Sequence, residues 1–173
     1  MMYKKTFLTL TTIALLVLPA CSGSSGSESP NDSTRITIDA TLTSSNKGIQ
    51  SLNTDDSVTY GWNLLEGEGT VDGAPVEVEV INVLDYLRGT GEFTGFATFL
   101  YGDGSMLTVK LIGEAAAATD TSNATFEGAL TVIGGTGIYL DAAGTGTMTG
   151  ERENTVGSPV ALTFVIDVVA EGD

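Results

Sequence analysis

The sequence predicts an all-β fold, in which an eight-stranded antiparallel sheet closes into a barrel after a signal peptide and a flexible tether. Apolar and polar residues alternate over many short segments, and no segment keeps the 3.6-residue apolar spacing of an amphipathic helix. Glycine is frequent and proline is rare, with 22 and 4 residues, so short glycine turns can join the segments. Closure removes exposed strand edges. A two-sheet sandwich is the alternative that the pattern leaves open.

The first 20 residues have the pattern of an export signal. Lys4 and Lys5 precede an apolar run from Phe7 to Leu18, which is shorter than the roughly 20 residues of a membrane span. The run ends in Leu18-Pro19-Ala20-Cys21, which resembles the lipobox of bacterial lipoproteins. That resemblance implies cleavage before Cys21 and acylation of its thiol. An ordinary secretory signal with an incidental cysteine is the alternative, but Cys21 is the only cysteine in the chain.

Residues 21–33 form the predicted lipidated tether. The stretch after Cys21 is SGSSGSESPNDS, which has no apolar residue to bury and so is expected to stay flexible. Two or three acyl chains give lasting attachment to a bilayer. We therefore expect the bacterial cell envelope as the location, with the membrane as a partner through the anchor. Ser22 after the cysteine resembles the signal for the outer membrane in bacteria that have one.

Residues 34–173 form one predicted domain with eight strands. The first four are expected near residues 35–42, 58–64, 76–80 and 93–101. In the first, the even positions are apolar, whereas in the third three valines alternate with Glu77 and Glu79. In the second, the apolar face consists of Val58, Tyr60, Trp62 and Leu64, and the fourth is apolar on both faces.

The last four strands are expected near residues 106–117, 126–132, 144–152 and 162–168. Gly102-Asp103-Gly104 is typical of a hairpin turn between the fourth and fifth strands. Alanines cluster in residues 113–121, so a short helix there is an alternative to the end of a strand.

Composition excludes several classes of function. The formal net charge is −15, and Lys4 and Lys5 leave with the signal, so five basic residues face 22 acidic ones. This excludes nucleic acid as a partner, because phosphate binding needs clustered Lys and Arg. The chain has no histidine, which removes the commonest general base and the commonest transition-metal ligand. We expect neither a cofactor nor a bound metal.

A glycine-rich stretch, Val132-Ile133-Gly134-Gly135-Thr136-Gly137-Ile138-Tyr139, is the most distinctive motif. A phosphate loop would need a helix after it, but the next residues are strand-like and no Gly-Lys-Ser/Thr follows. We therefore interpret Gly134, Gly135, Thr136 and Gly137 as a structural turn. Asp55, Asp56 and Asp103 lack the spacing of a calcium loop and are expected to be turn residues.

A family resemblance covers roughly residues 93–152. Its motifs are Gly95-Phe96-Ala97-Thr98-Phe99, Asp103-Gly104-Ser105-Met106-Leu107-Thr108, the glycine-rich stretch above, and Ala143-Gly144-Thr145-Gly146. Together they resemble the allene oxide cyclase and dirigent protein superfamily. The resemblance implies a calycin-like, eight-stranded antiparallel barrel with an apolar cavity, no cofactor, and a homotrimer or homodimer. Members cyclise or isomerise fatty-acid epoxides, direct phenoxy-radical coupling, or close polyketide rings.

The resemblance also indicates one catalytic candidate. In plant members an acidic residue on the first strand faces the cavity, and Asp39 is the nearest match here. Alternation places Ile36, Ile38 and Ala40 inward and Asp39 outward, unless a bulge reverses the order. A solvated acid on the outer face is the alternative to a catalytic acid or base.

Extending the apolar faces inward predicts a set of residues that line a pocket. They are Tyr60, Trp62, Asn82, Tyr101, Met148 and Phe164. Polar tips among apolar walls are typical of a small-molecule site. A packed core with tyrosine hydroxyls near the rim is the alternative.

Three functions stay open on the sequence alone. The first is binding of a small apolar molecule or an interaction at the envelope. The second is a cofactor-free cyclase or isomerase, and the third is a purely structural, filled barrel. A cavity separates the third from the others, and a buried ionisable group inside it would favour the second.

The predicted anchor can be tested through its cysteine. Cys21→Ser removes the thiol that would carry the acyl chains, so the protein should move from the membrane fraction to the soluble fraction of a bacterial expression host. Fractionation followed by immunoblotting measures this. Continued retention of the variant in the membrane fraction would contradict the lipid anchor.

Overall fold

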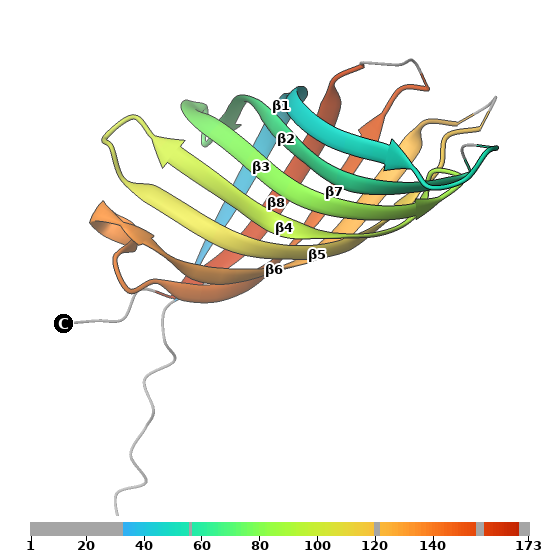
Figure 1. Ribbon diagram of the computed structural model, residues 1–173. Coiled ribbons are helices and arrows are strands. Elements are labelled where there is room, and N and C mark those ends of the chain that lie inside the picture. Colours follow the sequence, from blue (N-terminus) through green and yellow to red (C-terminus); the bar gives the residue numbers. More distant parts are fainter. Residues whose placement is uncertain (1–32, 56, 120–121, 155–157, 170–173) are drawn as a thin grey trace, which may run out of the picture. The chain divides into compact units, whose positions relative to one another are not determined.

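The computed structural model describes residues 33–55, 57–119, 122–154 and 158–169. The predicted signal peptide and Cys21 lie outside them. The described residues form eight antiparallel strands in one closed barrel, and each strand pairs with its neighbours in the sequence (Figure 1). The strands are β1 (Thr34–Ser51), β2 (Val58–Val71), β3 (Ala74–Leu87), β4 (Thr90–Tyr101), β5 (Met106–Ala116), β6 (Ala124–Thr136), β7 (Ala143–Arg152) and β8 (Val160–Val169).

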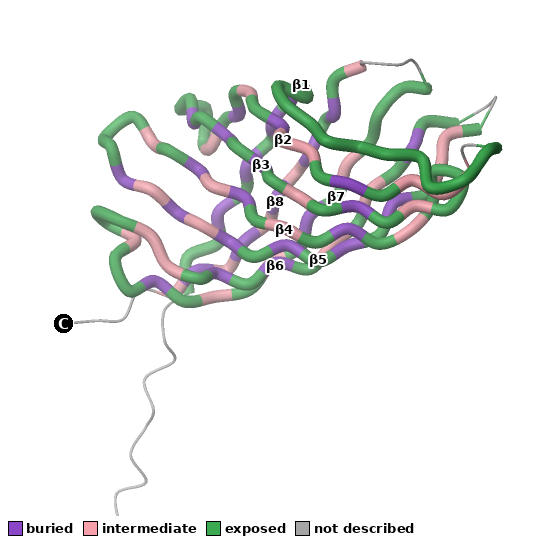
Figure 2. Tube along the Cα trace, viewed as in Figure 1, coloured by how far each residue is buried: buried purple, intermediate pink, exposed green. Residues whose placement is uncertain are grey.

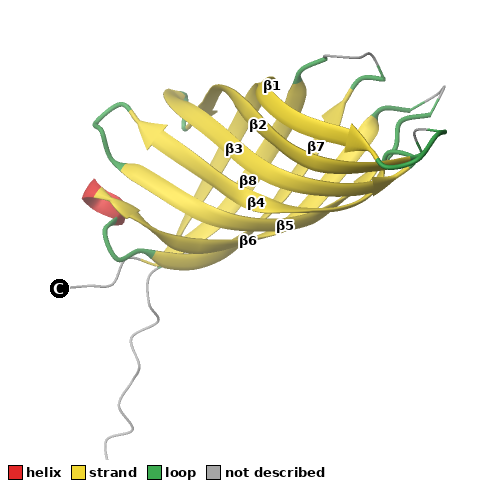
Figure 3. Ribbon diagram, viewed as in Figure 1, coloured by secondary structure: helices red, strands yellow, loops and turns green. Residues whose placement is uncertain are grey.

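Pairing of the first strand with the last closes the barrel. The register runs from Thr34 opposite Val168 to Leu42 opposite Val160. The predicted barrel is therefore confirmed, and the sandwich alternative is wrong. The alternative of a short helix in residues 113–121 is also wrong for its first part, because β5 continues to Ala116. Figure 3 shows strands throughout and one short 3-10 helix, η1 (Gly137–Tyr139), at one end of the barrel.

The two ends of the barrel differ. We call the end that carries η1 and the β2–β3 and β4–β5 turns the closed end. The opposite, open end carries the β1–β2, β3–β4, β5–β6 and β7–β8 connections. At the closed end the rings of Tyr101 and Tyr139 lie 5.0 Å apart between centroids, and Ser105 is buried. Tyr139 and Ala142 pack against the core, so η1 and the residues after it cover this end.

Asp103 and the glycines of the distinctive stretch shape the closed end. The Ser105 backbone N–H and hydroxyl both donate to Asp103 Oδ1, at 2.9 and 2.6 Å, and these bonds lower the pKa of the carboxyl. Asp103 thus serves as a turn residue. The φ angles of Gly134 and Gly137 are 121° and 62°, values that other residues rarely adopt. A Cβ on Gly137 would also lie 2.7 Å from Ser105 Cβ, so η1 can begin only at a glycine.

The core fills the half of the barrel nearer the closed end. Buried and exposed residues alternate along the strands, as Figure 2 shows, so one face of each strand points inward. Phe99 and Phe164 are fully buried, and their rings meet edge to face with centroids 5.0 Å apart. Ile38, Leu107 and Ile166 are equally buried. The contact between aromatic rings adds to the free energy gained by burying these side chains.

The outer wall carries many exposed apolar side chains over β2–β5. Among them are Tyr60, Trp62, Ile81, Val83, Phe96, Leu100 and Ile112. The register places Leu64 opposite Ile81, and Ile81 opposite Phe96, so these residues form a continuous strip across three strands. Among the residues that the structure describes, no helix is long and apolar enough to cross a bilayer.

Phe164 offers a test of the packed half of the barrel. Phe164→Ala should lower the free energy of unfolding by about 3–5 kcal/mol, because it removes a fully buried ring and leaves a cavity against Phe99. Urea unfolding followed by circular dichroism measures the change. Ile112→Ala, which truncates a side chain that is 55% exposed, is the control and should cost much less. Equal losses in the two variants would contradict the assigned core.

Candidate ligand cavity

A cavity of about 570 Å³ lies in the open half of the barrel. This volume is within the range of small-molecule sites, about 300–1,000 Å³. Its apolar walls are formed by side chains from β2 to β8, namely Leu65, Val80, Leu84, Phe93, Leu111, Ala124, Phe126, Met148, Val160 and Leu162. The next inward residues towards the closed end, such as Val78, Phe99 and Phe164, are buried and form its floor. The barrel is thus filled at one end and hollow at the other.

Four of the six predicted pocket residues lie inside the barrel. Asn82 and Met148 line the cavity. Phe164 lies below it in the floor, packed on Phe99. Tyr101 points inward at the closed end, beside Tyr139, and not into the cavity. For Phe164 and Tyr101 the packed-core alternative therefore describes the structure better than the pocket does.

The predicted placement of Tyr60 and Trp62 is wrong. They are 50% and 38% exposed and lie on the outer face of β2, whereas Thr59, Asn63 and Leu65 line the cavity. The inner face of β2 carries glycines where it crosses β1. A Cβ on Gly61 would lie 2.2 Å from the carbonyl oxygen of Gly48. Large side chains are thereby excluded from the inner face at this crossing, and Trp62 packs its indole over Gly48 on the outside.

A β-bulge in β1 turns Lys47 toward the cavity, which the alternation of residues did not predict. The register with β2 shifts between Ser44 and Asn46, so one residue of β1 has no partner. Before the bulge the even positions of β1 face inward, but after it Lys47 is opposite Asn63, and both line the cavity. A bulge has this effect because one extra residue exchanges the two faces of a strand.

The cavity lining includes one buried polar atom without a hydrogen-bond partner, on Asn82, and one partly buried phenol, on Tyr86. Asn82 Oδ1 is buried, and no donor reaches it among the described residues. Tyr86 also lines the cavity. Burial raises its pKa to about 12, and the nearby Arg152 guanidinium opposes this rise. Tyr86 is therefore an uncharged phenol at neutral pH. A buried acceptor without a partner is costly, so a ligand that donates to Asn82 would gain free energy.

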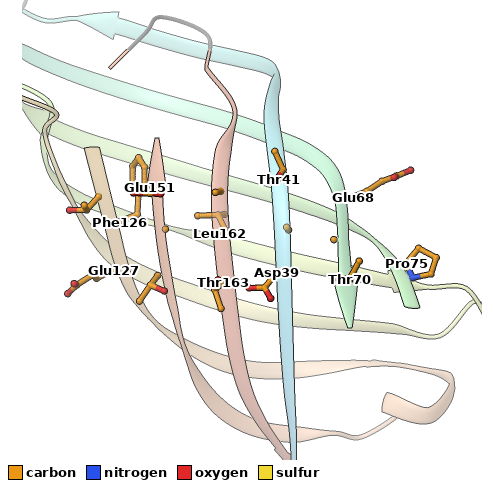
Figure 4. Close-up of a pocket in the computed structure, with 16 residues that line it drawn as sticks. Asp39, Thr41, Glu68, Thr70, Pro75, Phe126, Glu127, Glu151, Leu162 and Thr163 are labelled. Carbon is orange, nitrogen blue, oxygen red and sulfur yellow. Dashed lines mark hydrogen bonds between the residues drawn. The ribbon is translucent and has the colours of Figure 1, made fainter. Parts of the chain in front are cut away.

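Asp39 faces a different hollow, a groove of about 760 Å³ on the outer wall (Figure 4). Asp39 is exposed and accepts a 2.7 Å hydrogen bond from the Thr163 hydroxyl. The bulge in β1 lies beyond Asp39, so it does not turn this side chain inward. Glu68, Glu127 and Glu151 line the same groove. Its walls are mostly threonines and acids, and the groove lies on the opposite side of the sheet from the cavity.

The groups that a ligand would meet in the cavity are apolar side chains, the amides of asparagines, the phenol of Tyr86 and basic side chains. No carboxylate lines it within the described ranges.

Asp55, considered above for calcium, instead accepts hydrogen bonds from the backbone N–H and hydroxyl of Ser57, and these lower its pKa. Within the described part of the chain, no group of three or more acidic, cysteine or histidine residues could hold a metal ion. No protein-family model matches the chain, and no curated protein matches it.

The raised pKa of Tyr86 predicts a loss of stability at high pH. Between pH 10 and pH 12 the unfolded chain ionises this phenol whereas the folded protein does not, so the free energy of unfolding should fall. Tyr86→Phe should fall less over this range, which urea unfolding at a series of pH values measures. Tyr60→Phe removes an exposed phenol and should follow the parent protein. If the two variants have the same profile, Tyr86 is not desolvated.

Proposed function

We propose that this protein binds a small, largely apolar molecule in the open half of its barrel. The observation that carries the proposal is a cavity of about 570 Å³ above a packed floor. Apolar walls with a few polar groups are what such sites require, because the walls provide affinity and the polar groups fix orientation. Here Asn82, Tyr86 and Asn63 are the polar groups among the walls.

A filled barrel that serves only as a structural element explains these observations less well. Large apolar side chains fill the half near η1, and in β2 the bulkiest ones stand outside. Filling the open half would need only larger residues at positions such as Ala124 or Val80, which line the space. A void of this size lowers stability relative to a packed interior, since its lining atoms lose van der Waals contacts.

Binding is also a better proposal than acid–base catalysis. A cyclase or isomerase would use an ionisable group that reaches the substrate at an accessible pKa. Among the described residues that line the cavity there is no carboxylate, and burial raises the pKa of the Tyr86 phenol away from neutrality. Asp39 lies on the other side of the wall. A cofactor-free isomerase that only orients its substrate is the alternative function.

The setting we propose is the bacterial envelope, with the barrel attached through acylated Cys21 and the tether. The support is the sequence of the first 33 residues, together with the start of the barrel at Thr34, where the polar tether ends. We also propose membership of the allene oxide cyclase and dirigent protein superfamily. Its support is the residue motifs of β4–β7, and the superfamily's barrel has the strand number and direction seen here.

Two adjacent leucines on opposite faces of β2 test the binding proposal. Leu65 lines the cavity and is buried, whereas Leu64 lies half-exposed on the outer face. Leu65→Trp should fill the cavity and weaken binding of the neutral fluorescent probe N-phenylnaphthylamine by at least about tenfold, or about 1.4 kcal/mol. Fluorescence titration measures the affinity.

Leu64→Trp adds the same side chain outside and should bind the probe as the parent protein does. Circular dichroism shows whether each variant is folded, and Val80→Phe is a second way of filling the cavity. A parent protein that does not bind the probe, or a filled cavity that binds it unchanged, would overturn the proposal.

A further inference from the structure

The cavity carries a charge opposite to that of the protein. Three basic residues, Lys47, Arg88 and Arg152, line it, out of five in the chain after the export signal. No acidic side chain lines it within the described ranges, although the chain has 22 acidic residues. The outer groove shows the reverse, since Asp39 and three glutamates line it and no basic residue among those that the structure describes does so. We call Lys47, Arg88 and Arg152 the mouth cations.

Local backbone features bring the mouth cations to the cavity. The bulge between Ser44 and Asn46 turns Lys47 inward. Arg152 ends β7, and its charge acts on the phenol of Tyr86 within the cavity. Arg88 occupies the turn between β3 and β4 with a φ angle of 54°.

The position of Arg88 is unfavourable for an arginine. Arg88 and Gly89 both have positive φ angles, 54° and 80°, so their turn is of the hairpin type that favours Asn-Gly or Asp-Gly. The turn between β2 and β3 has the same geometry, and there the favoured pair Asp72-Gly73 is present. A left-handed conformation is unfavourable for most residues other than Gly, Asn and Asp, because the Cβ lies too close to the carbonyl oxygen that follows it. Arginine at this mouth position therefore indicates a role beyond forming the turn.

The two remaining basic residues are on the outside. Arg35 forms a salt bridge with Asp167, with a distance of 2.8 Å from Nε to Oδ1. Lys110 lies on the outer face of β5, opposite Phe96. In contrast to Arg35, the mouth cations form no salt bridge with any residue that the structure describes. Their charges are thus available to a ligand.

We propose that the ligand is a single-chain amphiphile with an anionic head group, a carboxylate or a phosphate. This inference rests on the proposed binding function and adds the charge of the ligand. The apolar chain lies against walls such as Leu111 and Met148, and the head group lies at the mouth. Arginine suits both head groups, because its planar fork donates two hydrogen bonds to them. The protein's overall negative charge repels anions, so recognition depends on these local cations.

Ligands that share one chain but differ in the head group test the inference. The protein is the full chain carrying Cys21→Ser, so that no acyl chain of its own competes for the cavity. Decanoate, decyl phosphate, decanol and decyltrimethylammonium are each used to displace N-phenylnaphthylamine. At least one of the two anions should bind about tenfold more tightly than decanol, and the cationic compound should bind weakest. The tighter of the two anions distinguishes a fatty acid from a phosphorylated lipid as the natural source.

A matched pair of double variants tests which cations are responsible. Arg88→Gln with Arg152→Gln should weaken binding of the preferred anion about tenfold or more and leave decanol within about twofold, since only the anion can form hydrogen bonds between opposite charges with these side chains. Arg35→Gln with Lys110→Gln makes the same change in net charge outside the cavity. It should leave all four affinities within about twofold. Urea unfolding verifies that both double variants fold.

The outcomes separate this inference from the binding function itself. If decanol binds as tightly as the anions, or if the two double variants behave alike, the anionic head group is refuted while the cavity still binds apolar molecules. If neither the probe nor any of the four compounds binds, both proposals fall together.

Discussion

Hydrogen bonds between β1 and β8, from Thr34 and Val168 to Leu42 and Val160, join the two edges of the sheet. Without them both strands would present unpaired backbone groups to water and to other chains. With them, every strand has two partners, and the sheet acquires an inside and an outside. Each residue's face then decides whether it meets the core, the cavity or solvent. The packed floor, the hollow half and the distribution of charge all follow from this closure.

Closure also explains why the acidic residues are where they are. A carboxylate inside the barrel would lose its hydration, which is costly unless a partner compensates. The acids of β2 and β3, including Glu66, Glu77 and Glu79, accordingly alternate outward. The mouth cations are at the end of the barrel, where long side chains can lie along apolar walls and keep their charged ends hydrated. The place of a charged residue therefore depends on its position along the strand as much as on the face of the strand to which it belongs.

Much of the fold could be predicted from alternation alone. The valines of β3 and the two isoleucines at the start of β1 lie on the buried face that the pattern indicates, and Asp39 lies on the exposed face. The prediction from alternation failed in β2, because it assigns the face with the larger apolar side chains to the core. The close approach of β1 and β2 at Gly61 leaves no room for a side chain, so Tyr60 and Trp62 are outside. The spacing of Gly61, Gly67 and Gly69 places all three on one face of β2. That spacing was the available sign that this face has no room for large side chains.

The mouth of the cavity was harder to predict than its walls. Lys47 faces inward only because of a bulge, and a bulge depends on how two strands pair, which one segment's residues do not reveal. Arg88 and Arg152 belong to different hairpins, and only the closed barrel brings them to one cavity. Asn82 and Met148, by contrast, follow the alternation of their own strands, β3 and β7, and that alternation was enough to place them.

The chain enters the barrel at its closed end, since Thr34 pairs with Val168 near the end of β8. A barrel held through the residues before Thr34 is therefore held by its floor, and its mouth is at the opposite pole. The attachment that we propose through Cys21 and the ligand exchange that we propose at the mouth would then be at different poles of one small domain. With that arrangement, loading or unloading would not require release of the anchor, and a donor or acceptor of the ligand would meet the free pole while the protein remained attached.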